Sequence, residues 1–151
     1  WAVGNTSVGS EVTVRWTGGP TWTRIGPTAA VPDQILRSVS CTNGNDCWAT
    51  GDPRTGGPAA QRGEVLARWA GGPDWSRPGP YGGVANVTLF GIHMVNASEG
   101  YAVGNTGTIA AWNGSIWNSQ ASPVASRLRA VAMAPAGGGA VAVQRWREII
   151  Q

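Results

Sequence analysis

Two cysteines are the residues of this chain whose spacing most directly predicts chemistry. Five residues lie between Cys41 and Cys47, which is not the Cys-x-x-Cys spacing of redox motifs. A four-ligand zinc site is also excluded for the pair alone, because the chain has a single histidine. We expect a disulfide across a hairpin, worth about 2 kcal/mol by loop entropy. A disulfide predicts an oxidising compartment, either extracellular or periplasmic.

The two kinds of catalytic site that we consider would use the only histidine, His93, or one of the two tyrosines, Tyr81 and Tyr101. A Ser-His-Asp type of site needs a nucleophile, and no Gly-x-Ser-x-Gly element lies near His93. A sialidase-like glycosidase needs clustered arginines, a tyrosine nucleophile and acidic partners. Arg37 and Arg129 hold matching positions in a repeat, but the eight acidic residues lie mostly in turns. We therefore predict no enzyme, no catalytic residue, no metal and no cofactor.

Since we predict no catalytic site, we consider ligand binding as the role of the remaining polar residues. The segment Asp52–Gly63 (DPRTGGPAAQRG) carries Arg54 and Arg62 and is an insertion between two predicted strands. Long loops on a rigid scaffold often carry recognition, although an insertion of little consequence is the alternative. The residues that we consider for ligand binding are Arg54, Arg62, His93, Arg37 and Arg129. His93 is expected to line a central channel, or to be structural.

An internal repeat determines which elements position these residues. Glu11–Gly26 and Glu64–Gly79 match at ten of sixteen positions with an offset of 53, and Ile109–Asn118 is a weaker copy. A second unit alternates with the first and occurs as Leu36–Asp52, Leu89–Asn105 and Leu128–Gln144. Repeats of about 40–50 residues that contain short alternating apolar runs are typical of β-propeller blades.

Aromatic residues recur at fixed places in the repeat, which makes them structural by default. Nine tryptophans stand against one phenylalanine. Each hairpin of the first unit has one Trp before its turn and one after it, so the two rings can meet across the hairpin. The repeated aromatic residues are Trp16, Trp22, Trp48, Trp69, Trp75, Tyr101, Trp112 and Trp117. Exposed tryptophan rings that stack on sugars are the functional alternative.

The predicted fold class is all-β, a β-propeller segment of four-stranded antiparallel blades, with a little over three blades present. We name the strands of a blade A to D in chain order. Residues 1–26 would supply strands B to D of one blade, 36–77 a second blade, 89–120 a third, and 128–151 the start of a fourth. In the aligned blades Cys41 matches Met94 and Met133, and Cys47 matches Gly100 and Gly139. A β-sandwich and a β-solenoid are the alternative folds.

The same residues carry a family resemblance. Leu-x-x-Val-x-Cys-x5-Cys-x-Ala-x-Gly followed by a Trp-x-Gly-x-x-Trp hairpin resembles bacterial propeller repeats of the photosystem II stability/assembly factor-like and BNR/Asp-box kind. The segments in the place of the Asp-box hairpin are Thr17–Trp22, Ala70–Trp75 and Asn113–Trp117, and each lacks the Asp of the box. The resemblance extends to about Gln144 and implies the fold. It leaves the function open, because such propellers serve many roles.

Charge and composition narrow the classes of partner. The eleven basic residues are all arginine, the net charge is +3, and the arginines are scattered, so we expect no nucleic acid. No apolar run approaches the 20 residues of a membrane span. The first and last predicted blades are incomplete, so we expect further blades from the same chain or, alternatively, self-association. The C-terminal RWREIIQ could be a merged C-D segment.

The function that we expect from these features is a non-catalytic, extracytoplasmic binding or scaffold module. Its ligand would be a protein, and the module would bind that protein or assist its assembly. The alternative is a lectin-like propeller that binds a glycan, and part of a glycosidase is the least favoured reading.

Overall fold

The computed structural model describes residues 1–6, 11–25, 35–53, 66–77, 81–82, 84, 86–134 and 140–143. In these residues the chain is all-β, with one 3-10 turn, η2, at Asn105–Gly107. The strands are β1 Ala2–Asn5, β2 Glu11–Arg15, β3 Thr23–Ile25, β4 Leu36–Asn43, β5 Asp46–Gly51, β6 Leu66–Trp69, β7 Tyr81–Gly82, β8 Leu89–Asn96, β9 Glu99–Gly104, β10 Ile109–Trp112, β11 Trp117–Gln120, β12 Ala130–Met133 and β13 Ala140–Val143.

These strands form four small sheets. Sheet 1 has the order β1-β2-β3, sheet 2 the order β4-β5-β6, sheet 3 the order β7-β11-β10-β9-β8, and sheet 4 pairs β12 with β13. Neighbouring strands are antiparallel except β7, which runs parallel to β11. In sheet 2 an antiparallel bridge between Arg68 and Ser76 stands where strand D is expected. The repeat did not predict β7.

The hairpins between strands A and B are closed in the same way in sheets 2 and 3. The side-chain oxygen of Asn43 accepts a hydrogen bond from the backbone N–H of Asn45 at 2.8 Å. The side-chain oxygen of Asn96 accepts a hydrogen bond from the backbone N–H of Ser98 in the same way, at 2.7 Å. An Asn at this position closes a tight turn without help from the rest of the fold. Local sequence therefore determines these two hairpins.

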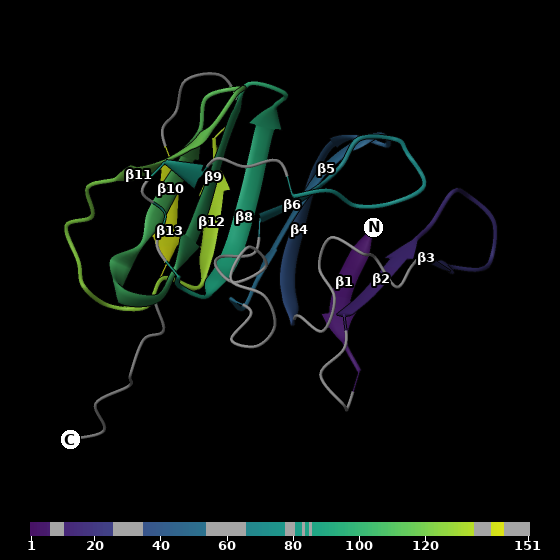
Figure 1. Ribbon diagram of the computed structural model, residues 1–151, viewed down its shortest axis with the longest axis horizontal. Coiled ribbons are helices and arrows are strands. Elements are labelled where there is room, and N and C mark those ends of the chain that lie inside the picture. Colours follow the sequence, from purple (N-terminus) through teal and green to yellow (C-terminus); the bar gives the residue numbers. More distant parts are fainter. Residues whose placement is uncertain are drawn as a thin grey trace.

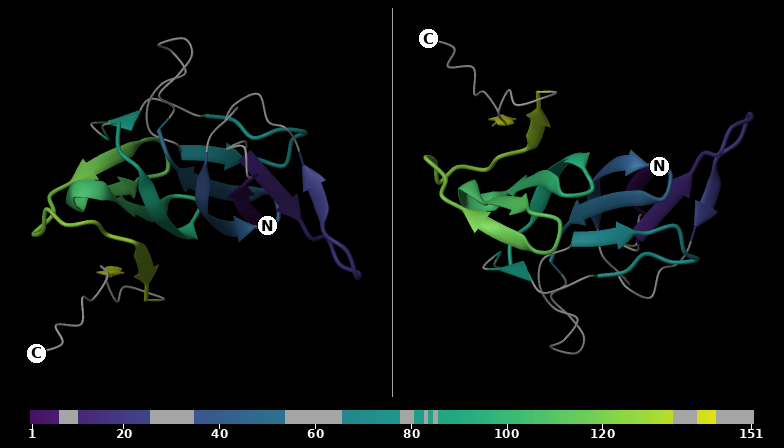
Figure 2. Two further views of the ribbon diagram at one scale, coloured as in Figure 1. Left: turned by 90° about the horizontal axis from the view of Figure 1, so that it is seen from below. Right: turned by 90° about the horizontal axis from the view of Figure 1, so that it is seen from above.

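The sheets follow one another in a row, as Figures 1 and 2 show. β1 packs against β4, β4 against β8, and β8 against β12. Two apolar cores lie between successive sheets rather than within a sheet. The core between sheets 1 and 2 includes Leu36, Cys47, Trp69 and Trp75, and partly buried Trp1 packs on it.

The second core lies between sheets 2 and 3, and its largest members are Trp48, Trp112 and Trp117. Sheets that bury one face on the next have the layered packing expected of successive blades. The described residues form an open row, however, and not a closed ring.

Candidate functional site

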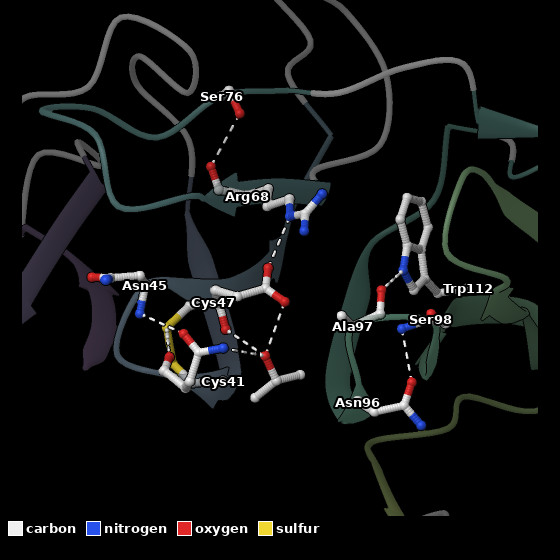
Figure 3. Close-up of polar contacts among 12 residues, drawn as sticks. Cys41, Asn45, Cys47, Arg68, Ser76, Asn96, Ala97, Ser98 and Trp112 are labelled. Carbon is white, nitrogen blue, oxygen red and sulfur yellow. Dashed lines mark hydrogen bonds and ion pairs between the residues drawn. A yellow bond between two sulfur atoms is a disulfide. The ribbon is translucent and has the colours of Figure 1, made fainter.

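The predicted disulfide joins Cys41 to Cys47 across the β4–β5 hairpin, with their Cα atoms 4.0 Å apart (Figure 3). In sheet 3 the matching residues are Met94 and Gly100. The Met94 thioether occupies the space in which a side chain at Gly100 would lie, as the repeat predicted. Cys41 and Cys47 therefore have a structural role in their hairpin, as Met94 and Gly100 have in theirs.

In the fourth repeat the alignment is wrong by one residue. It places Gly139 opposite Met133, whereas the structure pairs Met133 with Ala140. Gly139 itself lies outside the described residues. The shift has a simple cause, since six residues lie between the partners Met133 and Ala140 but five between Met94 and Gly100.

The recurring aromatic residues form clusters of three rings that join neighbouring sheets. Trp48 on β5 lies 4.7 Å from Trp112 and 5.3 Å from Trp117, measured between ring centroids. Trp112 and Trp117 are themselves 5.6 Å apart across the β10–β11 hairpin. The indole N–H of Trp112 donates to the carbonyl of Ala97 at 2.9 Å (Figure 3). Sequence reasoning paired the rings across a hairpin but missed the third ring, because it comes from the preceding sheet.

The cluster between sheets 1 and 2 repeats this geometry. Trp1 lies 4.8 Å from Trp69 and 5.2 Å from Trp75. The interplanar angles are 54° and 79° here, against 55° and 80° in the cluster around Trp48. The third hairpin pair, Trp16 and Trp22, differs because its rings are 53% and 54% exposed. In the described part of the chain no ring stacks on them.

The strongest candidate for ligand binding is a cluster of arginines around one aromatic ring. The guanidinium carbons of Arg37, Arg127 and Arg129 lie 5.1, 5.0 and 5.7 Å from the centroid of the Phe90 ring. Three successive sheets supply these residues, each at or just before the start of its strand A. We call this group the arginine cluster. Its members are exposed on the surface except Phe90, which is half-buried.

One carboxylate balances part of this positive charge. Both oxygens of Asp52 accept hydrogen bonds from Arg37, at 2.7 and 2.8 Å. These bonds raise the pKa of Arg37 above its ordinary value, so its guanidinium stays charged. Arg127 donates to the neutral side-chain oxygen of Asn105 at 2.9 Å. For Arg129 the described residues include no hydrogen-bond or ion-pair partner, so the cluster keeps a net positive charge.

The other predicted site residues lie apart from this cluster or outside the described residues. His93 is half-buried on β8 and pairs with Tyr101 on β9. Arg54, Arg62 and most of the insertion after Pro53 lie outside the described residues, as does the C-terminal RWREIIQ. Arg127 was missed by sequence reasoning, although its position two residues before Arg129 was the available signal.

Other site types find little support in the described residues. No group of three or more potential metal ligands occurs there. No described helix has the length and apolar character that a membrane crossing requires. An open hollow of about 540 Å³ beside η2 is lined by small and uncharged residues, among them Thr106, Ser119 and Gln120. Such a lining provides no acid, base or charge for chemistry.

No family model, curated protein or solved structure matches this chain.

Proposed function

We propose that this chain is a non-catalytic binding module of the β-propeller type, and that it recognises acidic groups of a protein ligand through the arginine cluster. The observation that carries the proposal is the convergence of Arg37, Arg127 and Arg129 on the ring of Phe90, where the described residues supply one balancing carboxylate. Planar guanidinium groups favour carboxylates because two N–H donors match two oxygens. Three of them, one on β4 and two just before β12, give a preformed cationic subsite for an anion.

The architecture supports this kind of role. Three sheets present the starts of their A strands side by side, so Arg37 on β4 and the ring of Phe90 on β8 meet the two arginines just before β12. Sites built on rigid elements hold their geometry before the ligand arrives. Small, mostly antiparallel sheets that pack on one another in chain order favour a propeller, as does the sequence resemblance. A structural disulfide favours an extracellular or periplasmic protein.

Peptide binding tests the proposal directly. A labelled Asp- and Glu-rich peptide should bind at low ionic strength, and a Lys-rich peptide of equal length should not. Arg129→Gln should weaken binding about fivefold, the effect of one exposed ion pair worth about 1 kcal/mol. Asp52→Asn should strengthen binding, because it releases Arg37 from its internal partner. Arg24→Gln, an exposed arginine on β3, is the matched control and should change nothing.

Two results would contradict this function. One is equal binding of the acidic and basic peptides. The other is acidic-peptide binding that responds to Arg24→Gln as strongly as to Arg129→Gln. Binding should also weaken with added salt, because exposed charges are screened at physiological ionic strength.

The exposed rings of Trp16 and Trp22 favour a second candidate, a carbohydrate-binding module. A glycan array separates the two candidates. Sugar binding that Trp22→Ala abolishes and Arg129→Gln leaves intact would favour the carbohydrate.

A further inference from the structure

We propose that the open hollow beside η2 is a second subsite for the same ligand, and that it takes an uncharged hydrogen-bonding side chain of the Asn, Gln, Ser or Thr kind. The arginine cluster would hold an acidic residue of a peptide, and the hollow would hold a neutral polar residue close to it. This inference rests on the proposed function and adds the class of sequence that the site selects. Three features of the hollow support it: its position, its polar side chains and the backbone that shapes it.

The hollow lies at the same end of sheet 3 as the arginine cluster. Leu89, at the start of β8, lies opposite Gly104, at the end of β9. Ile109, at the start of β10, lies opposite Gln120, at the end of β11. η2 joins the end of β9 to the start of β10 at this same end. Phe90 is the second residue of β8, so the ring of the arginine cluster and the hollow share one end of the sheet.

The chain itself connects the hollow to the cluster. Asn105 accepts the hydrogen bond of Arg127 at 2.9 Å, and Thr106, the next residue, lines the hollow. On the other wall Ala125 lines the hollow and lies two residues before Arg127. Two residues of extended chain span about 7 Å. Neighbouring residues of one bound peptide can therefore reach both subsites.

Three polar side chains of the hollow have unused hydrogen-bonding capacity. In the described part of the chain no hydrogen-bond partner is present for the side chains of Thr108, Ser119 and Gln120, which line the hollow. Thr106 and Ser122 also line it, but their hydroxyls donate to backbone carbonyls, at 2.7 and 2.9 Å. Free amide and hydroxyl groups both donate and accept hydrogen bonds, so they match a neutral polar group of a ligand.

The lining also favours an uncharged group over a charged one. None of the described lining residues carries an ionisable side chain. A charged group that entered would lose part of its water contacts and meet no opposite charge, whereas an amide or a hydroxyl would exchange water for hydrogen bonds. The volume of about 540 Å³ lies within the range of small-ligand sites. An acidic residue is therefore directed to the arginines and a neutral polar residue to the hollow.

The backbone around the hollow is fixed in an unusual shape. Thr106 has a φ of 53° and is the only described residue other than glycine with a positive φ. A β-branched residue is rarely found in this left-handed region, and such strain is typical of ligand-binding turns. The repeat does not require it, since Pro53 stands at the matching position of sheet 2 and proline cannot adopt a positive φ.

The segment that forms the other wall is tied to the sheet. The backbone N–H of Leu128 donates to the carbonyl of Gly104 at 2.9 Å. The hydroxyl of Ser122 also accepts the backbone N–H of Val124 at 3.3 Å, which closes the turn at the rim. Both walls of the hollow are therefore in place before a ligand binds, which lowers the ordering cost of binding.

Two labelled peptides of equal length and equal charge test the inference by fluorescence anisotropy. Both carry the same acidic residues, and the residues beside these are Gln and Asn in one peptide and Ala in the other. We expect the Gln/Asn peptide to bind about threefold to tenfold more tightly, the effect of one hydrogen bond gained. Arg129→Gln should weaken both peptides by the same factor, because it removes the acidic contact that they share.

Variants of the hollow should act on the preference alone. Ser119→Ala and Gln120→Ala should each reduce the preference for the Gln/Asn peptide, and both positions are exposed, so the variants should stay folded. Ser115→Ala removes an exposed hydroxyl at the other end of the β10–β11 hairpin and is the matched control. It should keep the preference in full.

The outcomes separate this inference from the proposed function. Equal affinity for the two peptides would overturn the hollow as a subsite and leave the arginine cluster as the binding site. A preference that Ser115→Ala reduces as much as Ser119→Ala would also overturn it. No binding of either peptide would overturn both proposals. A neutral sugar whose binding Gln120→Ala weakens, and which the acidic peptide does not displace, would assign the hollow to a carbohydrate and overturn the peptide subsite.

Discussion

At the scale of single residues, glycine decides how closely strand A can approach strand B. The carbonyl oxygen of Ile35 accepts the N–H of Asp52 at 2.9 Å, and Gly51 leaves room for this contact. Gly51→Ala should lower the free energy of unfolding by about 1–3 kcal/mol, because the new methyl group overlaps that carbonyl. Urea denaturation measures the loss. The control, Gly72→Ala, should change the free energy of unfolding by less than about 0.5 kcal/mol. Equal losses for the two variants would contradict the explanation.

The disulfide gives a second prediction at the residue scale. Reduction should increase the intact mass by two hydrogens and lower the free energy of unfolding by about 2 kcal/mol. The double change Cys41→Met with Cys47→Gly copies the pairing of Met94 with Gly100. It should recover part of the stability that Cys41→Ser with Cys47→Ser loses, because the thioether refills the space. Equal stability of the two double variants would show that this packing contributes nothing.

At the scale of elements, a small polar network holds the β4–β5 hairpin to β6 (Figure 3). Arg68 donates to Asp46 at 2.9 Å, and the hydroxyl of Thr42 donates to the other carboxylate oxygen at 2.9 Å. The guanidinium of Arg68 also lies 5.4 Å from the ring of Trp48. The Asp46 side chain is only 10% exposed, so these partners replace most of the water contacts of its carboxylate.

Arg68→Met should therefore cost about 1–3 kcal/mol of unfolding free energy, the cost of a nearly buried charge that loses a partner. Thermal or urea unfolding measures it. Arg24→Met on β3 removes an exposed arginine and should cost under about 0.5 kcal/mol. If Asp46→Asn combined with Arg68→Met does not recover stability, the unpaired charge is not the cause.

At the scale of the whole molecule, the cores lie between sheets, so a sheet at the end of the row is held on one face only. In a chain of such units, local opening should be easiest at the ends. Hydrogen exchange at low protein concentration should be slowest in β5 and β9 and faster in β2. Uniform protection of these strands would contradict this view.

Local chemistry made much of the fold predictable from the sequence. Strand positions, the Asn-closed hairpins and the Cys41–Cys47 bridge all depend on residues that are close together along the chain. The repeat extended these predictions from one sheet to the next, so Met94 over Gly100 followed from the cysteines. The partners in the fourth repeat are one residue further apart along the chain than Met94 and Gly100 are. The same reasoning therefore failed by one position at Met133, because the alignment does not detect such a local shift.

The sequence by itself determined an all-β chain of repeated short strands with a disulfide in one hairpin. Tertiary structure alone decided which side chains from different sheets meet. The convergence of the three arginines on Phe90 and the third ring of each tryptophan cluster are contacts between sheets. The repeat aligned Arg37 with Arg129, but it did not predict that they share one ring. The exposure of Trp16 and Trp22 has the same origin, since a repeat predicts equal positions but not which copy has a neighbour.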